Sequence, residues 1–360
     1  MARRGGTYLF YPARKRSGAR GCLLTGLFFV LAIVTAVLLI NSATNTRLEL
    51  SSETVTVMGL DKTFEGFTVL HVSDLHGNAL GSDAQMWEDL LYGKRFDAVV
   101  MTGDMVGSAG NAQPLTDLIA SLRSLNAKAP IYFIEGDDDP DAVNAEAHGS
   151  PEALADWVLR AQEAGAIYLD APVRQEVGKY AVWFTPEYLY GVDAQGMAAA
   201  LEGQKASMEA QGVPYQDEGG ASYRALCYRL DAMNRTAQAV EEVADTDLQI
   251  ALSHMPLEAD YIRTSLEWAP ENAAFSFRNI SLLLAGHYCA GQWRLPGLGA
   301  LYVPEWGWLT PDENIVGMQR VNSINQYISK GMAASEAYPM GGRLLNPPGI
   351  TLLRFTGTLR

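Results

Sequence analysis

Short apolar runs that end abruptly in polar residues recur along this chain and set its predicted architecture. Each run is as long as a strand and apolar throughout, which is typical of a strand buried on both faces. Helical spacing of apolar residues over 85–94 and 113–125 separates the first three runs and predicts an α/β sheet of parallel type. In such sheets ligands collect at the carboxyl ends of the strands. The runs with their polar ends are Phe67–Gly77, Asp97–Asp104, Pro130–Asp139, Leu248–His254 and Ile280–His287.

The segments around these strands are predicted to complete one large domain. Alternating polarity over 46–57 predicts an early half-buried strand, and 151–164 has the pattern of a further helix. Short β-like pieces follow over 166–192. The stretch 194–244 is rich in Ala, Glu, Gln and Met, so we predict a helical insert before the next core strand. The tail over 291–355 alternates short β-like runs with Gly and Pro.

An apolar stretch near the amino terminus is long enough to span a bilayer core of about 30 Å. Residues 1–20 before it carry six basic side chains and no acid. This charge pattern predicts a cytoplasmic tail at 1–20, a single-pass anchor in the cell membrane at 21–41 and an extracytoplasmic domain at 42–360. The alternative is a signal peptide cleaved near Asn41-Ser-Ala43. Signal peptides have apolar runs of about 7–15 residues, and the longer run here favours the anchor.

Composition and cysteine content narrow the function classes. The chain has 41 acidic and 27 basic residues, so nucleic-acid binding through a basic face is not expected. Acidity does not exclude phosphorylated substrates, because bound cations reverse the sign of a site locally. Cys22 lies in the apolar stretch, and Cys227 and Cys289 are the only other cysteines. The chain therefore has no disulfide scaffold.

The polar ends of the five apolar runs carry residue types that bind divalent metals. Asp74 and His76 stand two positions apart, so an extended chain would point both to the same side. A single histidine at the end of a strand is usually packed or simply exposed. Three of the five histidines stand at these ends, which indicates a shared metal site. The candidate groups are Asp74, His76, Asp104, Asp137, Asp138, His254, His287 and Cys289.

The order and spacing of these groups resemble those of the calcineurin-like metallophosphoesterases. The family pattern is Asp-x-His, Gly-Asp, Gly-Asn-His-Asp/Glu, a lone His, and Gly-His-x-His. The resemblance implies an αββα sandwich of two mixed sheets, here preceded by one transmembrane helix. Likeness over 291–296 and 346–353 points to the membrane-anchored bacterial extracytoplasmic branch. The matching residues are Asp74-Leu-His76, Gly103-Asp104, Gly136-Asp137-Asp138-Asp139, Ser253-His254 and Gly286-His287-Tyr-Cys289.

Roles carried over from the family imply two divalent metal ions that share one carboxylate, Asp104. Two cations about 3.5–4 Å apart can hold a bridging hydroxide and stabilise an in-line displacement at phosphorus. A bridging carboxylate keeps the cations close and cancels part of their repulsion. By this resemblance one ion takes Asp74, His76, Asp104 and Cys289, and the other takes Asp104, Asp137, His254 and His287.

Three positions depart from the family pattern, and each still carries a group able to bind metal. Asp137 replaces Asn and adds negative charge. Cys289 replaces the last His with a softer ligand, so we expect Zn, Fe or Mn, with Zn or Fe favoured. Asp138 replaces the histidine that assists the leaving group or binds the phosphoryl oxygen. Asp138 is the predicted catalytic residue if it acts as an acid, which requires a raised pKa. His148 is the other candidate for that role.

We therefore expect hydrolysis of a phosphomonoester, phosphodiester or pyrophosphate by a two-metal-bridged hydroxide at the outer face of the cell membrane. The substrate would be a phosphorylated small molecule, a lipid-linked phosphate or a cell-wall phosphate. One alternative is a catalytically impaired relative that binds metal or a phosphorylated ligand, because Asp138 stands where the family has His. Another is an interaction protein whose partner surface is the insert at 194–244.

Five further side chains each have two interpretations. His71 lies inside a strand, where core packing is the favoured role. Trp293, Trp306 and Trp308 could line a substrate groove or cover the edge of a sheet. Arg294 could meet a phosphate, although a surface salt bridge is the favoured interpretation.

Overall fold

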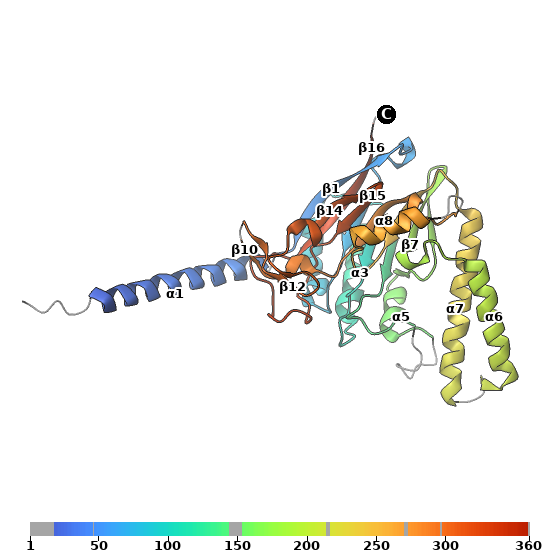
Figure 1. Ribbon diagram of the computed structural model, residues 1–360, viewed down its shortest axis with the longest axis horizontal. Helices are drawn as coiled ribbons and strands as arrows, with labels where there is room; N and C mark the ends of the chain where they lie inside the picture. The colour runs from blue at the N-terminus through green and yellow to red at the C-terminus, as the bar shows by residue number, and fades with distance from the viewer. Residues whose placement is uncertain are drawn as a thin grey trace, which may run out of the picture.

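Two six-stranded sheets pack face to face with helices on both outer sides (Figure 1). This arrangement confirms the αββα sandwich of two mixed sheets. His148 and the start of the helix predicted at 151–164 lie outside the described residues. The computed structural model describes residues 18–45, 47–143, 153–213, 217–269, 273–295 and 297–358.

The first sheet contains three of the five predicted strands. Its strands, in spatial order, are β1 (Glu49–Met58), β16 (Gly349–Thr358), β2 (Thr68–Val72), β3 (Ala98–Thr102), β4 (Ile131–Ile134) and β5 (Ile167–Tyr168). Strands β2 to β5 are parallel, and β16 runs antiparallel to β2. The carboxyl ends of β2, β3 and β4 therefore lie along one edge.

The second sheet contains the other two predicted strands, β8 and β9. Its strands, in spatial order, are β14 (Gly317–Val321), β15 (Ile324–Ile328), β9 (Ile280–Ala285), β8 (Leu248–Leu252), β7 (Tyr180–Pro186) and β6 (Val173–Val177). Strands β15, β9, β8 and β7 are parallel, with an antiparallel strand at each edge. Two small hairpins follow β9: β10 (Arg294–Leu295) with β11 (Gly299–Ala300), and β12 (Tyr302–Val303) with β13 (Gly307–Trp308).

Alternate residues of the core strands serve two different hydrophobic cores. In β2, Val69 faces the core between the sheets, and Leu70 faces the core under the outer helices. In β3, Val100 likewise faces the core between the sheets, and Met101 faces the core under the outer helices. Because both faces are buried, these strands are continuously apolar.

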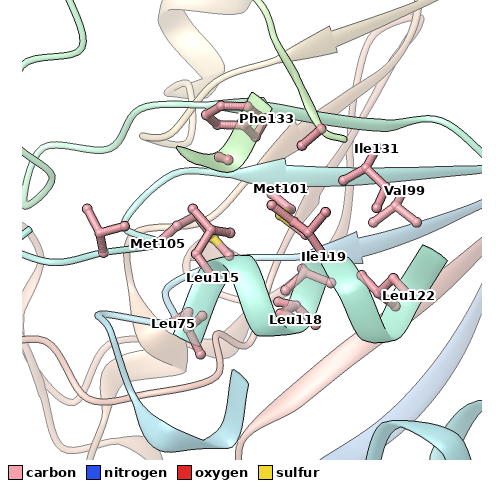
Figure 2. Close-up of a cluster of buried hydrophobic side chains, with 14 of the residues drawn as sticks. Leu75, Val99, Met101, Met105, Leu115, Leu118, Ile119, Leu122, Ile131 and Phe133 are labelled. Atoms are coloured by element: carbon pink, nitrogen blue, oxygen red, sulfur yellow. The ribbon is translucent and has the colours of Figure 1, made fainter. Parts of the chain in front are cut away.

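The helices cover the outer faces of both sheets. They are α2 (Ala84–Leu91), α3 (Gln113–Leu125), α5 (Asp156–Glu163), α6 (Ala194–Ala210), α7 (Asp217–Glu242) and α8 (Ala259–Trp268). Figure 2 shows Leu118 and Ile119 of α3 against Met101 and Phe133 of the first sheet. Ile262 of α8 packs in the core outside the second sheet. Helices α6 and α7 pack against each other and occupy most of the stretch 194–244.

Helix α1 (Gly18–Asn45) leaves the domain as a long rod (Figure 1). Within it, Cys22–Ala43 is long and apolar enough to cross a membrane, by length and composition. The end of α1 is hydrogen-bonded to the domain. The Asn41 side-chain amide donates to the Arg343 carbonyl at 3.0 Å, and the Leu345 N–H donates to Asn41 Oδ1 at 2.7 Å.

Replacing Leu118 by Ala tests the packing of α3 on the first sheet. Leu118 is fully buried, so we expect the cavity to lower the free energy of unfolding by about 2–5 kcal/mol. Denaturant unfolding followed by circular dichroism measures the change. Leu298→Ala is the matched control, because Leu298 is 62% exposed, and it should change stability by less than about 0.5 kcal/mol. Equal losses in both variants would contradict the assigned packing.

Candidate metal centre

The loops that follow β2 and β3 run side by side and bring Asp74 and His76 next to Asp104. The Asp74 N–H donates to the Gly103 carbonyl at 3.1 Å, and the His76 N–H donates to the Asp104 carbonyl at 2.7 Å. Asp74 and His76 have φ angles of 54° and 46°, so neither continues the extended strand. The expectation that alternation along a strand aligns them is therefore wrong. Backbone pairing between two loops positions them instead.

Left-handed backbone is concentrated at this centre. A non-glycine residue in that region costs about 1–2 kcal/mol. Such strain clusters at functional sites, where the surrounding structure holds the residue in place. The residues at the centre with positive φ are Asp74, His76, Asp104, His287 and Cys289.

Glycines let the backbones at the strand ends approach closely. A Cβ on Gly136 would lie 2.1 Å from Asp104 Oδ1, and one on Gly286 would lie 2.9 Å from Asp74 Oδ2. Neither contact leaves room for a side chain. These two positions therefore need glycine because a carboxylate of the centre packs directly against the backbone.

Asp104, Asp137, His254 and His287 form one compact group, with one ligand atom from each lying within 4.8 Å of the others. His254 Nδ1 lies 2.8 Å from the Thr102 carbonyl, which can only accept a hydrogen bond. That bond leaves Nε2 directed at the carboxylates, 2.6 Å from Asp137 and 3.2 Å from Asp104. Metal-binding histidines are commonly oriented in this way. The group combines residues of both sheets.

The carboxylates of this group change the protonation of its imidazoles. Burial lowers the pKa of His254, but hydrogen bonds to Asp104 and Asp137 outweigh burial and raise that pKa well above its usual range. Burial also lowers the pKa of His287, but hydrogen bonds to Asp137 and Glu305 outweigh it and raise that pKa to about 9. Hydrogen bonds from His254 and His287 hold the pKa of Asp137 far below normal. The group therefore requires positive charge, which protons or metal cations can supply.

A second set of groups surrounds His76. Asp74, His76 and Cys289 place one ligand atom each within 4.8 Å, and so do His76, Asp104 and Asp138. His76 Nε2 is buried 3.6 Å from Asp104 Oδ2, and among the described residues it has no hydrogen-bond partner. Burial raises the pKa of the Cys289 thiol well above normal, so a bound cation would be needed to form the thiolate.

The grouping of these residues differs in one respect from the assignment of metal ligands that the family resemblance implies. Asp104 groups with His76 and Asp138, whereas Asp74 and Cys289 group with His76 alone. Asp138 Oδ2 lies 3.4 Å from His76 Nδ1 and accepts a hydrogen bond from Ser335 Oγ at 3.3 Å. The Asp138 side chain is thus directed toward the candidate ligands. Its role as an acid, and the ligand roles of the other seven residues, stay predictions.

Glu305 is a residue of the centre that the sequence did not reveal. It lies in the turn between β12 and β13, and its Oε1 lies 3.0 Å from His287 Nε2. The other nitrogen of His287, Nδ1, lies 3.0 Å from Asp137 Oδ1. Glu305 thus orients His287 toward the group at Asp137. No motif marks this glutamate, because it stands in an irregular segment far from any core strand.

Asp139 belongs to the third motif but has a structural role. Its buried carboxylate accepts the backbone N–H groups of Met105, Val106 and Gly107, at 2.8–3.0 Å, and of Gly136 at 3.1 Å. These bonds join the loop after β3 to the loop after β4. Asp104 and Asp137 are thereby held on neighbouring loops.

His71 and Arg294 lie outside the ligand groups, in the structural roles that the sequence favoured for them. His71 is fully buried, its Nε2 lies 2.8 Å from Thr102 Oγ1, and burial lowers its pKa to about 3. Arg294 pairs with Asp312, as a surface salt bridge would. Cys227 and Cys289 are both free in the described chain.

A cavity of about 690 Å³ separates the helical insert from the first sheet. Glu135, directly before Gly136 of the third motif, lines one wall together with Tyr168 and Tyr188. The opposite wall consists of side chains from α6 and α7. The pocket therefore lies between the insert and the start of the loop that carries the third motif.

Comparison with known proteins assigns the family. Residues 67–290, more than half of the chain, match the family described as calcineurin-like phosphoesterase. The chain belongs to this family, whose members are metal-dependent hydrolases of phosphoester bonds. The match contains all the predicted site residues. The family implies divalent metal ions and a phosphorylated substrate.

Two solved structures are similar to the chain at low identity. Phosphopantetheinyl hydrolase from Mycobacterium tuberculosis is 14% identical over 74% of this chain and 89% of its own, with a TM-score of 0.35. The TT1561 protein of Thermus thermophilus is 13% identical over 74% of this chain and 90% of its own, with a TM-score of 0.34. No curated protein matches the chain.

Replacing Asp139 by Ala tests its role in holding the loops. The variant leaves backbone N–H groups of two loops without their acceptor, so we expect the free energy of unfolding to fall by about 1–3 kcal/mol. Urea unfolding measures this change. Asp245→Ala, at an exposed loop position, is the control and should stay within about 0.5 kcal/mol of the parent. An unchanged stability for Asp139→Ala would show that the loops do not depend on this carboxylate.

Replacing Glu305 by Gln tests whether it orients His287. Because an oriented imidazole binds metal more tightly, we expect metal affinity to fall about 10–100-fold. Competition with a chromophoric chelator measures affinity without any need for turnover. Glu313→Gln, at an exposed position after the same hairpin, is the matched control. If both variants keep the affinity of the parent, Glu305 does not position a ligand.

Proposed function

We propose that the chain is a membrane-tethered phosphoesterase that works outside the cytoplasm with two divalent cations. The proposal takes 21–41 as an uncleaved anchor, 1–20 as its cytoplasmic tail and 42–360 as the catalytic domain with a helical insert at 194–244. One cation would be held by Asp104, Asp137, His254 and His287. The other would be held by Asp74, His76 and Cys289, and by Asp104, which reaches this set through His76 and Asp138.

The observation that carries this proposal is the shared position of Asp104. Its carboxylate belongs both to the group with His254 and to the group with His76. A carboxylate between two ligand groups can bridge a pair of cations. The remaining oxygen, Oδ1, accepts the Asp138 N–H at 2.9 Å, so Asp104 has little freedom to turn away.

The residues present fit divalent cations in two further respects. His76 Nε2 is a buried nitrogen without a hydrogen-bond partner among the described residues. A buried polar atom of this kind is suited to bind an ion. The centre also has more carboxylates than imidazoles, and both His254 and His287 gain protons as a result. Cations would replace those protons when they bind.

The protein's own groups would hold and orient the reacting species. When bound, the pair of cations supplies Lewis acidity and an activated water. Thr102 and Glu305 orient His254 and His287, so those imidazoles need little rearrangement on binding. Asp138 faces the same space and would deliver a proton to the leaving group.

The proposed tether would keep the domain near the membrane. This favours a substrate whose phosphate is also near the membrane, either lipid-linked or in the cell wall. The end of α1 is bonded directly to the domain through Asn41 and Leu345. The domain would therefore remain close to the bilayer rather than at the end of a flexible linker. A phosphorylated small molecule is the remaining substrate class.

The second candidate function is binding without efficient turnover. It is favoured by the carboxylate of Asp138 at the position where the family has His. An ionised Asp138 would repel the phosphate of a substrate, while the metal ligands would remain intact.

Replacing Asp104 by Ala tests the bridging assignment. The change removes a ligand common to both groups, so we expect metal content to fall and turnover to drop by more than about 100-fold. Elemental analysis gives the metal content, and a chromogenic phosphodiester with Mn, Zn or Fe gives turnover. Asp245→Ala should match the parent in both. Activity that survives in Asp104→Ala would exclude a bridging role.

Replacing Asp138 by Asn separates the two candidate functions. Asn keeps the size and an oxygen but cannot donate the acid proton, so the proposed mechanism predicts a loss of about 100-fold or more in turnover. Metal content should be unchanged. A parent protein that binds metal without turnover, and gains turnover in Asp138→His, would instead establish the non-catalytic alternative.

A further inference from the structure

Exposed apolar side chains gather on the two small hairpins that follow β9. Leu298 stands in the turn of the first hairpin, and Trp306, Trp308 and Leu309 belong to the second; we call these four side chains the apolar rim. They are 42–69% exposed. Figure 1 shows β10 and β12 at the end of the domain from which α1 leaves. Large apolar side chains that stay exposed on adjoining hairpins are candidates for an interaction surface.

Hydrogen bonds fix the two hairpins to each other and to the segment 342–346. The Leu301 N–H donates to the Trp293 carbonyl at 2.8 Å, and the Leu309 N–H donates to the Leu301 carbonyl at 2.9 Å. The Arg294 N–H donates to the Leu344 carbonyl at 2.9 Å. The apolar rim is therefore a fixed part of the domain surface.

The same segment holds the end of the apolar helix. Leu345 donates its N–H to Asn41, which lies two residues before the end of the candidate span Cys22–Ala43. At about 1.5 Å per residue, those 22 residues are about 33 Å long, close to the bilayer core of about 30 Å. In the proposed tether, Asn41 therefore lies at the boundary of the hydrocarbon, with segment 342–346 next to it.

Segment 342–346 also contacts the candidate metal centre. The Asn346 side-chain amide donates to the Cys289 carbonyl at 2.9 Å. From the hairpin side, Glu305 contacts His287 at 3.0 Å. Hydrogen bonds therefore connect the end of α1, the hairpins that carry the apolar rim and the metal centre.

We infer that the apolar rim rests on the surface of the lipid bilayer. The inference depends on the membrane tether of the proposed function, but not on catalysis. Trp306 and Trp308 have the amphipathic rings that favour the membrane–water interface. Beside the rim, the carboxylate of Asp312 is already paired with the guanidinium of Arg294, which reduces the cost of bringing that charge to the interface. In this position the metal centre lies at the level of the lipid head groups.

Tryptophan fluorescence of the full chain in nanodiscs tests the inference. The chain has seven tryptophans, all at or after Trp87, so α1 contributes no signal. Lipids brominated on the acyl chain near the head group quench tryptophans that contact them. We expect quenching in the parent and loss of most of it in the double variant Trp306→Phe, Trp308→Phe.

Trp268→Phe is the matched control, because Trp268 is 81% exposed at the end of α8, a helix that Figure 1 shows apart from α1. It should leave the lipid quenching unchanged. Quenching that persists in the double variant, or that Trp268→Phe removes equally, would overturn the inference. A chain that does not enter nanodiscs would overturn the tether and this inference together. Because the readout needs no turnover, an inactive enzyme that still shows rim-dependent quenching would count against the proposed function alone.

Discussion

The structure depends on the neutralisation of carboxylates that converge where the two sheets meet. Asp74, Asp104 and Asp137 come from the first sheet, whereas His254 and His287 come from the second. Charge of one sign packed this densely is costly in a low-dielectric environment unless it is compensated. The nearby carboxylates also raise the pKa values of His254 and His287, which shows that the centre favours positive charge. A pair of divalent cations would meet it and would give the family its chemistry.

The backbone around the centre is built to keep these groups together. Paired loops after β2 and β3, the four N–H groups gathered by Asp139, and glycines that admit close contact replace the regular strand geometry. Several residues accept left-handed backbone, which is costly unless the surroundings enforce it. The two cores on either side of the first sheet provide that rigid support. Buried apolar strands thus position polar residues that would otherwise repel one another.

Much of this could be predicted from the sequence because apolar runs and the residues at their ends are local features. The five strands and the helix Gln113–Leu125 follow directly from hydrophobic periodicity, and the sandwich follows from the family motifs. Features that arise only when distant segments come together in the folded chain could not be predicted in this way. Glu305 reaches His287 from an irregular turn, and the positive φ angles of Asp74 and His76 arise from loop pairing. The direction of the Asp138 side chain is likewise set by its neighbours, His76 and Ser335.

Anomalous diffraction from crystals grown with Zn or Mn is the most direct test of the central claim. Data collected at the absorption edge of the metal locate each ion without reference to activity. The account predicts two peaks about 3.5–4 Å apart, one on each side of the Asp104 carboxylate, with His254 and His287 beside one and His76 beside the other. A single peak remote from Asp104, or no peak in a folded protein, would contradict it.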